Sequence, residues 1–272
     1  MPPQAAPVAS VRDAISAAED ALGAAGSDTP RLDAELLIAH AMGVSREALF
    51  THPGAGVPPP AARRAMELVR RRVAREPVAY ILGVKGFRNI DLHVDPRVLI
   101  PRPETELLVE LALGLPEGSR VHDVGTGSGA VALALKQERP GLRVSASDAS
   151  LAAVEVAREN AAALGLDVPV SVAPGLPAGP YDMVLANLPY VREDEWPRLS
   201  PGITRYEPRD AFVSGVDGLD AIRALVAEAP TGMLLALEHA PAQAEAVRSL
   251  LDEPESHRDL AGRERVTVGR AP

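Results

Sequence analysis

From Arg120 onward, short apolar runs alternate with stretches of helical length. The runs predict buried strands over Val121–Val124, Val144–Ser147, Val170–Val172, Asp182–Ala186, Met233–Leu237 and Arg265–Gly269. The stretches between them predict helices over Ala130–Glu138, Leu151–Leu164, Leu219–Glu228 and Ala242–Leu251. Short apolar strands that alternate with helices are typical of a parallel sheet covered on both faces. We therefore expect an α/β fold in this part of the chain, with a doubly wound sheet.

Residues 1–76 predict a small helical domain. Pro30 is placed to open its second helix and Gly43 to end it, while Ser45 is placed to cap a short third helix. The apolar residues at helical spacing, which we expect to face inward, are Val11, Ile15, Ala18 and Leu22, then Leu32, Leu36 and Leu37, and on a fourth helix Ala62, Met66, Val69 and Val73. No chemistry is evident here, so this part is either a plain bundle or a module that binds a protein substrate.

Residues 77–100 have strand character, and the alternation from Ile90 to Val94 predicts a β-hairpin that links the two domains. The following segment, Leu99-Ile-Pro-Arg-Pro-Glu-Thr-Glu106, is held extended by its two prolines and leads into a helix over Leu107–Leu115. We therefore divide the chain into a helical domain (1–76), a hairpin linker (77–100) and an α/β domain (101–272).

Composition excludes several classes of protein. The 272 residues contain no cysteine, which excludes disulfides, cysteine nucleophiles and thiolate metal sites. No apolar run is long enough to span a bilayer, and the N-terminal residues lack the pattern of a secretory signal, so we expect a soluble, cytoplasmic protein that does not bind a membrane. The net charge of −9 disfavours direct binding of nucleic acid. One basic stretch is either a solvated helix face or a docking surface for an acidic partner or RNA, and it contains Arg63, Arg64, Arg70, Arg71, Arg72 and Arg75.

A glycine-rich loop, Asp123-Val-Gly-Thr-Gly-Ser-Gly129, lies between the first predicted strand of the α/β domain and its helix. Glycine is needed where a backbone must approach a ligand closely or adopt a positive φ. The loop also satisfies the dinucleotide fingerprint, so alone it is ambiguous between a nicotinamide and another nucleoside cofactor. Asp148 ends the next strand about 20 residues further on, where a carboxylate usually binds the ribose hydroxyls. Its alternative role is to cap the helix that begins near Ser150.

A second loop, Asn187-Leu-Pro-Tyr190, follows the fourth predicted strand. In a doubly wound sheet this strand lies beside the first, and ligands bind at the carboxyl ends of the strands there. Asn187 is thereby expected close to the glycine loop. A carboxamide oxygen and a backbone carbonyl can each accept one N–H of a planar NH₂ group, while Pro189 stiffens the turn and Tyr190 packs flat on the group. Together the two loops favour methyl transfer from S-adenosylmethionine to a nitrogen atom.

With these motifs, the chain resembles the HemK-type release factor glutamine methyltransferases over nearly its whole length. The segments that carry the resemblance are Val98–Glu110, Asp123–Ala134, Val156–Ala161, Tyr206–Arg209, Asp217–Ile222 and Asp259–Val266. The proline-rich segment and the C-terminal segment are specific to that family. The resemblance implies a mostly parallel, seven-stranded class I methyltransferase sheet, and S-adenosylmethionine as the cofactor.

The resemblance also implies a substrate and a site. The substrate would be the Gln side chain in the Gly-Gly-Gln loop of class I peptide chain release factors, and the helical domain would dock the release factor. The residues expected at the cofactor are Gly125, Thr126, Gly127, Ser128, Gly129, Asp148 and Asn187. Those expected to hold the Gln amide are Asn187, Leu188, Pro189 and Tyr190, of which Asn187, Pro189 and Tyr190 are the catalytic candidates.

Three alternatives stay open at this point. Leu188 stands where the family usually has a first proline, and Asn-Leu-Pro-Tyr is also typical of rRNA adenine dimethyltransferases, so methylation of adenine N6 in RNA or DNA is the main one. A nicotinamide-dependent oxidoreductase would explain the glycines and Asp148 but not the second loop. A module that has lost turnover is suggested by Leu188 and by Ala173–Leu176, which lacks the acid and aromatic usual near the adenine.

The histidines show no metal-binding spacing, so we expect no metal site. His122 lies within the first strand of the α/β domain and fits a core histidine with satisfied hydrogen bonds. Glu238 and His239 end the fifth strand, at the edge where the ligand is expected, which leaves a supporting role open for them. A glycine expected after His239 is replaced by Ala240.

Overall fold

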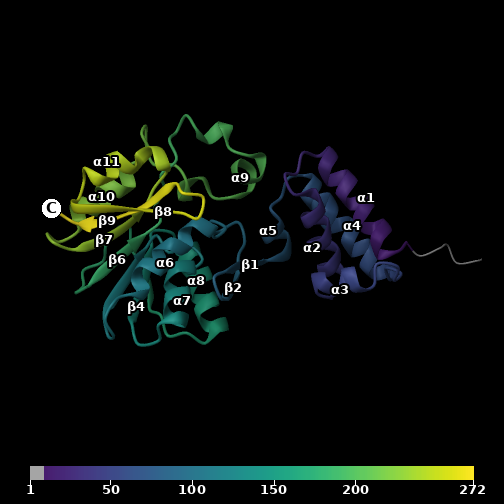
Figure 1. Ribbon diagram of the computed structural model, residues 1–272, viewed down its shortest axis with the longest axis horizontal. Coiled ribbons are helices and arrows are strands. Elements are labelled where there is room, and N and C mark those ends of the chain that lie inside the picture. The colour runs from purple at the N-terminus through teal and green to yellow at the C-terminus, as the bar shows by residue number, and fades with distance from the viewer. Residues whose placement is uncertain (1–8) are drawn as a thin grey trace, which may run out of the picture. The chain divides into compact units, whose positions relative to one another are not determined.

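The computed structural model describes residues 9–272, so residues 1–8, where the secretory-signal pattern is missing, lie outside the described range. The chain divides into two compact units. One comprises the residues up to Gly83 together with Pro201–Tyr206, and the other comprises Val84–Ser200 and Glu207–Pro272. Figure 1 shows the elements of both. No helix among residues 9–272 is long and apolar enough to cross a membrane.

The first unit is helical. Its helices are α1 (Val11–Ala24), α2 (Pro30–Met42), α3 (Arg46–Thr51), α4 (Pro59–Val73), α5 (Val78–Leu82) and α9 (Pro201–Tyr206). α1 begins at a capping box in which Ser10 and Asp13 bond each other's backbone N–H, and α2 ends at Gly43, where φ is +67°. α9 comes from far along the chain, and the Tyr206 hydroxyl donates to the carbonyl oxygen of Ala74 at 2.9 Å. The predicted helices are confirmed, whereas α9 and α5 are additions, and α5 occupies the start of the segment for which strand character was predicted.

The buried face of α4 differs from the one predicted. Ala65 and Leu68 are buried, whereas Met66 and Val73 are exposed. Leu32, expected to face inward on α2, is exposed as well. The other two residues of the predicted stripe, Ala62 and Val69, are half-buried and pack against the core. The stripe is therefore only partly right, because α4 turns Ala65 and Leu68 toward the core, on the side where Arg72 reaches a buried carboxylate.

That carboxylate belongs to Asp33 of α2, and Arg72 Nε donates to it at 2.8 Å. Arg71 pairs with Glu76, and Arg75 donates to backbone carbonyl oxygens at the end of α1, including that of Ala25 at 2.9 Å. Three arginines of the basic stretch therefore hold the helical unit together. The other three, Arg63, Arg64 and Arg70, are exposed, as the solvated helix face considered from the sequence requires.

The second unit contains a hairpin, a sheet of seven strands and covering helices. The hairpin pairs β1 (Val84–Phe87) with β2 (Ile90–His93), as predicted. The sheet strands are β3 (Arg120–Val124), β4 (Arg143–Asp148), β5 (Val170–Val172), β6 (Met183–Ala186), β7 (Leu234–Glu238), β8 (Asp252–Arg258) and β9 (Glu264–Arg270). The helices are α6 (Glu106–Leu113), α7 (Ala130–Glu138), α8 (Leu151–Leu164), α10 (Asp220–Glu228) and α11 (Ala244–Arg248). Single 3₁₀ turns occur at Pro103–Thr105 (η1), Trp196–Arg198 (η2), Arg209–Ala211 (η3) and Pro241–Gln243 (η4).

The strand order is β5-β4-β3-β6-β7-β9-β8, with β9 antiparallel to β7 and to β8. The chain moves outward from β3 in one direction through β4 and β5, and then returns to place β6 against the other side of β3. This is the reversal of a doubly wound sheet, so the predicted fold class is confirmed. The loops that follow β3 and β6 meet at the same edge.

The sheet separates two hydrophobic cores. Along β6, Met183 and Leu185 pack into the core that contains α6, α7 and α8, whereas Val184 and Ala186 pack into the core that contains α10 and α11. Successive side chains of a strand point to opposite faces, which is why β6 is apolar throughout. Figure 1 shows helices on both sides of the strands. Because both of its faces are packed, the sheet holds the loops at the carboxyl ends of its strands in fixed positions.

Candidate active site

The glycine loop connects β3 to α7 in left-handed conformations. The φ angles of Gly125 and Gly127 are +72° and +57°. A Cβ atom on Gly125 would lie 2.9 Å from Leu188 Cδ2, so this glycine lets the two loops approach each other. A Cβ on Gly127 would meet no atom within 4 Å, because this part of the loop faces open space. The loop therefore presents bare backbone to a pocket.

Asp148 ends β4 and connects this loop to α8. Its Oδ2 accepts from the Gly127 N–H and its Oδ1 from the Ser150 N–H, both at 2.9 Å. The helix cap is Ser150, whose side chain accepts from Ala153 N. Asp148 is thus not the helix cap, although it holds the residue that is. Each carboxylate oxygen retains capacity for a further hydrogen bond from a ligand.

Asn187 follows β6 directly. Its Nδ2 donates to Thr105 Oγ1 at 3.0 Å, and Thr105 is itself 4% exposed. Within residues 9–272 the Asn187 side chain makes no other hydrogen bond, which leaves Oδ1 available as an acceptor. Thr105 belongs to the proline-rich segment, so a bond across 82 residues sets the direction of the carboxamide.

Tyr190, at the other end of this loop, is held twice. Its carbonyl oxygen accepts from Gln243 Nε2 at 2.9 Å, and its hydroxyl donates to Glu238 Oε1 at 3.3 Å. Burial and the nearby Glu238 carboxylate raise the pKa of the Tyr190 hydroxyl, so it is a neutral donor. The loop from Asn187 to Tyr190 is therefore tied at both ends.

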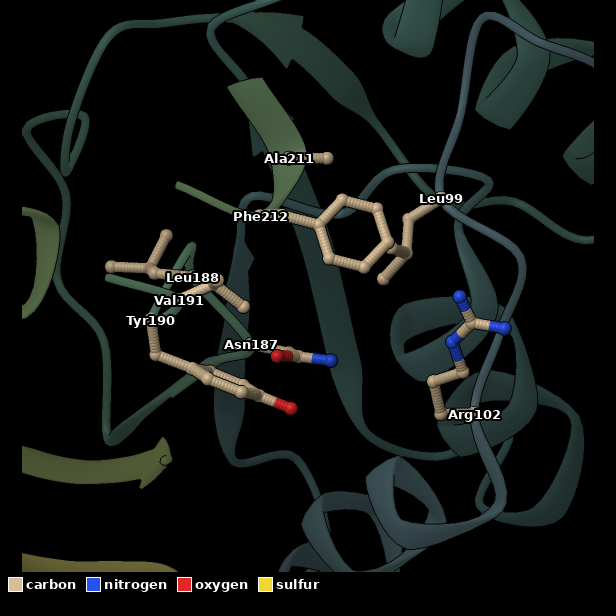
Figure 2. A pocket seen from close by; sticks show the side chains of 8 residues that line it. All are labelled: Leu99, Arg102, Asn187, Leu188, Tyr190, Val191, Ala211 and Phe212. Atoms are coloured by element: carbon tan, nitrogen blue, oxygen red, sulfur yellow. The ribbon is translucent and has the colours of Figure 1, made fainter. Parts of the chain in front are cut away.

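The proline-rich segment is fixed by Glu207. The Glu207 side chain is 1% exposed, accepts from the Ile100 N–H at 3.0 Å and pairs with the Arg102 guanidinium at 2.5 Å. The Arg102 guanidinium also lies 5.9 Å from the centre of the Phe212 ring. Arg102, Phe212 and Asn187, drawn in Figure 2, are among the residues that line a small cavity of about 40 Å³. Its lining consists of Leu99, Arg102, Asn187, Leu188, Tyr190, Val191, Ala211 and Phe212.

A larger pocket of about 520 Å³ lies beside this cavity, within the size range of small-molecule sites. It brings together residues from the ends of β3, β4 and β6, as predicted for a switch point. Of the residues expected from the sequence, it is lined by Gly125, Thr126, Gly127, Ser128, Asp148, Asn187, Leu188 and Pro189. Tyr190 lines only the smaller cavity, and Gly129 lines neither. Ala173 and Pro174 line the larger pocket, so the atypical loop after β5 does reach it.

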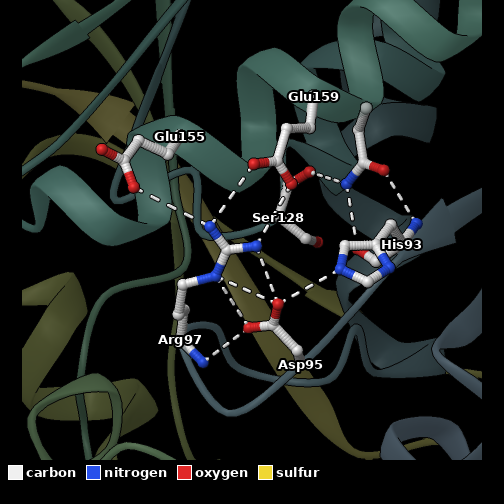
Figure 3. A network of polar contacts seen from close by, with 7 residues as sticks. His93, Asp95, Arg97, Ser128, Glu155 and Glu159 are labelled. Carbon is white, nitrogen blue, oxygen red and sulfur yellow. Dashed lines mark hydrogen bonds and ion pairs between the residues drawn. The ribbon is translucent and has the colours of Figure 1, made fainter.

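Asn160 of α8 holds the glycine loop by a hydrogen bond to its backbone. Its Nδ2 donates to the carbonyl oxygens of Ser128 and His93, at 2.9 and 3.0 Å, and its Oδ1 accepts from His93 N at 2.7 Å. Figure 3 shows this contact beside an ion-pair network in which Arg97 joins Asp95 to Glu159 of α8. Asn160 therefore connects the end of the β1–β2 hairpin and the glycine loop to α8 by hydrogen bonds.

Asp123, at the end of β3, is 2% exposed. Its Oδ2 accepts from Thr126 Oγ1 at 2.6 Å and from Ala132 N at 3.3 Å. Burial, which disfavours the charged form, raises the pKa of Asp123 to about 7. The Asp123 carboxyl thus stabilises the glycine loop through hydrogen bonds on the buried side of the loop.

His122 lies within β3, and His239 directly follows β7. His122 is buried, bonds Ser145 Oγ and Ser147 Oγ, and stacks on Tyr181, so its role as a satisfied core histidine is confirmed. Burial lowers its pKa to about 4. His239 bonds Thr267 of β9 and the Ala240 carbonyl oxygen instead of facing the pocket. Ala240 has a φ of −68°, so glycine is not required there. No group of three or more potential metal ligands occurs among residues 9–272.

Sequence reasoning missed three residues that shape the site, namely Thr105, Arg102 and Glu207. Two lie in the proline-rich segment and the third in Tyr206–Arg209, and both segments were noted only for their resemblance. The motifs that contain these residues were the signal that could have found them. The motifs do not reveal what the residues do, because each residue acts through a partner that is distant in sequence.

Comparison with known proteins shows the family of the chain. Residues 13–83 match the family model for the PrmC N-terminal domain, and residues 103–198 match that for the methyltransferase small domain. Proteins named release factor glutamine methyltransferase from Xylella fastidiosa and Deinococcus radiodurans are 43% and 40% identical. The alignment with the first covers 92% of this chain and 97% of the relative, and that with the second covers 96% and 98%.

Among solved structures, the hMettl16 catalytic domain in complex with MAT2A 3'UTR hairpin 6 aligns with a TM-score of 0.51. The alignment covers 78% of this chain and 81% of that one at 15% identity, so the likeness concerns the fold. The sequence relatives, by contrast, match over almost their full length. The chain belongs to the family of release factor glutamine methyltransferases.

Proposed function

We propose that this protein transfers a methyl group from S-adenosylmethionine to the side-chain amide nitrogen of the Gln in the Gly-Gly-Gln loop of class I peptide chain release factors. Family membership supports the reaction. The single structural observation that carries it is the Asn187 carboxamide, held by Thr105 at the edge of the pocket that the glycine loop also lines.

The larger pocket fits the cofactor. The backbone of residues 125–129 would hold it, because Gly127 presents no side chain to the pocket. Asp148 would accept hydrogen bonds from the ribose hydroxyls, and Asn187 would lie at the border between cofactor and substrate. When bound, S-adenosylmethionine supplies an electrophilic methyl group on a sulfonium.

The acceptor loop supplies orientation. An amide nitrogen is a poor nucleophile because its lone pair is delocalised into the carbonyl group. Asn187 Oδ1 and the Leu188 carbonyl oxygen would each accept one N–H of the Gln amide, which fixes the nitrogen in one direction. Thr105 keeps Nδ2 of Asn187 turned away, so the acceptor atom is the one presented.

Pro189 and Tyr190 would limit the motion of the amide. Pro189 stiffens the loop, and the Tyr190 ring would pack on the planar group. No strong base is required before attack, since the nitrogen becomes acidic once it is methylated. Leu188 does not remove the proposed hydrogen bond, because the backbone carbonyl makes it.

The helical unit would dock the release factor. Residues 13–83 match the family model for the PrmC N-terminal domain, and half of the basic stretch makes internal contacts. These contacts leave Arg71, Arg72 and Arg75 less free to grip RNA. We therefore favour a protein substrate over the adenine alternative.

The test combines the protein, labelled S-adenosylmethionine and a purified class I release factor, and locates the label by mass spectrometry. We expect the label on the Gln of the Gly-Gly-Gln loop and none on structured RNA in a parallel reaction. Asn187→Ala should lose transfer and keep its thermal unfolding midpoint within a few degrees. Label on RNA alone, or normal transfer by Asn187→Ala, would refute the proposal.

A further inference from the structure

Glu238 is a buried carboxyl that the reaction described above does not use. It ends β7, has no exposed surface, and its Oε2 has no hydrogen-bond partner in the described part of the chain. Its Oε1 accepts from the Tyr190 hydroxyl at 3.3 Å. Leaving a carboxyl oxygen unsatisfied in a protein interior costs stability, and native proteins accept such costs mainly at functional sites.

The groups that face Glu238 come from three other elements. They are Tyr190 from the loop after β6, Glu104 and Thr105 from η1, and Arg265 from β9. Burial and the negative charge of Glu104 raise the pKa of Glu238 to about 7, against the opposing effects of the two hydroxyls and Arg265. Arg265 is itself held by Asp259 at 3.0 Å, which gives the C-terminal family segment a place in this cluster.

We propose that Glu238 is a positioning residue for methyl transfer, which acts by holding the hydroxyl of Tyr190 and so fixing the ring that packs on the Gln amide. The inference rests on the proposed function, since it takes Tyr190 as part of the acceptor site. It assigns a role to the glutamate at the end of β7 that the motif pattern alone left open.

The contacts separate the ring of Tyr190 from its backbone. Gln243 Nε2 donates to the Tyr190 carbonyl oxygen at 2.9 Å, and a Cβ on Gly218 would lie 2.2 Å from that same oxygen. The backbone is therefore packed and bonded without any help from Glu238. Loss of the carboxyl should release the ring and leave the path of the loop unchanged.

The two ties of the acceptor loop thus have different tasks. Thr105 directs the Asn187 carboxamide at the first residue, and Glu238 directs the Tyr190 ring at the last. Pro189 between them transmits little rotation, because its φ is fixed. A substrate amide that is correctly bonded at Asn187 would still tilt out of its plane if the ring packed on it were free to move.

The experiment compares kcat and KM for four variants with a release factor as substrate. Glu238→Leu removes the acceptor, Tyr190→Phe removes the donor, and the double variant removes both. We expect each single variant to lower kcat roughly three- to tenfold, with KM for the release factor little changed. The double variant should be no worse than Glu238→Leu alone, because Tyr190→Phe removes a bond that Glu238→Leu has already removed together with the contact to the Thr105 hydroxyl. Glu238→Gln keeps an acceptor oxygen and should retain most of the activity.

Glu253→Gln is the matched control, since its side chain is 83% exposed on β8. Losses that multiply in the double variant would overturn the proposal, as would a wild-type kcat in Tyr190→Phe. The latter result decides the question even if Glu238→Leu does not fold.

A second readout does not depend on turnover. Fluorine NMR of protein that contains 3-fluorotyrosine, with the Tyr190 signal assigned by its loss in Tyr190→Phe, reports the state of the ring. We expect one sharp signal in the wild type and in Glu253→Gln, and a broadened or doubled signal in Glu238→Leu. An unchanged signal overturns the inference. If the wild type methylates no release factor, the proposed function fails while this measurement still decides the role of Glu238.

Discussion

The hydrogen bond between Thr105 and Asn187 gives the sharpest prediction. Thr105→Val replaces the hydroxyl by a methyl group of similar size, so the packing of this 4%-exposed side chain is retained. Asn187 Nδ2 then loses the acceptor that lies 3.0 Å away. An amide left without a partner costs about 1–3 kcal/mol when it is fully buried and less at a half-buried position such as that of Asn187, where the carboxamide can turn away from the direction in which it holds the substrate. Applied to the transition state, this corresponds to a loss of kcat/KM of roughly 5-fold and at most about 150-fold.

The assay is methyl transfer from labelled S-adenosylmethionine to a release factor, with kcat and KM measured separately. Thr105→Ser keeps the hydroxyl and should remain within about threefold of the wild type. Thr231→Val makes the same exchange at an exposed threonine that precedes β7 in the chain. It should leave both kcat and KM unchanged. If Thr105→Val has wild-type kcat/KM, the carboxamide is oriented by something else and the proposed geometry is wrong.

Three further predictions concern the glycine loop, a buried acid and the helical unit. Gly125→Ala, with φ of +72° and a Cβ 2.9 Å from Leu188, should weaken S-adenosylmethionine binding more than tenfold by calorimetry; Gly118→Ala, with φ of +79° and no neighbour within 4 Å, carries only the backbone strain and should bind normally. Because the folded-state pKa of Asp123 is raised from 3.8 to about 7, its stabilising contribution is complete below about pH 4 and is lost as the pH rises through 7. Asp123→Asn should therefore gain up to roughly 4 kcal/mol over the wild type in chemical denaturation at pH 8 and little at pH 4; an equal effect at both pH values would contradict this. Arg72→Leu strands the buried Asp33 carboxylate and should cost about 3 kcal/mol of unfolding free energy, whereas Arg70→Leu, at an exposed position, should cost almost none; equal unfolding midpoints for these two variants would show that the ion pair does not stabilise the unit.

Local pattern was enough for much of the fold. α7 and α8 begin and end at the residues predicted from sequence, and six of the seven sheet strands were anticipated. Strands buried on both faces must be apolar throughout, so they stand out in any sequence. The exception is β8, whose residues Asp252–Arg258 are mostly charged or polar. It is an edge strand, where charges prevent association with other chains and remove the apolar signal.

The choice of helix face in the first unit was decided by tertiary contacts. The apolar stripe on α4 pointed to Met66 and Val73, yet both are exposed. The ion pair between Arg72 and Asp33 is a polar interaction between helices, and a pattern that counts apolar residues cannot include it. The same limit explains why α9 was not predicted to belong to this unit.

For the site, the sequence by itself determined which residues would meet. The glycines, Asp148 and Asn187 follow different strands, and a parallel doubly wound sheet brings the ends of those strands to one edge whatever else the chain does. What only the tertiary structure decided was the direction of each functional group. The Asn187 carboxamide is aimed by Thr105 across 82 residues, and the Tyr190 ring by Glu238 across 48. Hydrogen bonds depend on positions within tenths of an ångström, and those positions exist only after the chain has folded.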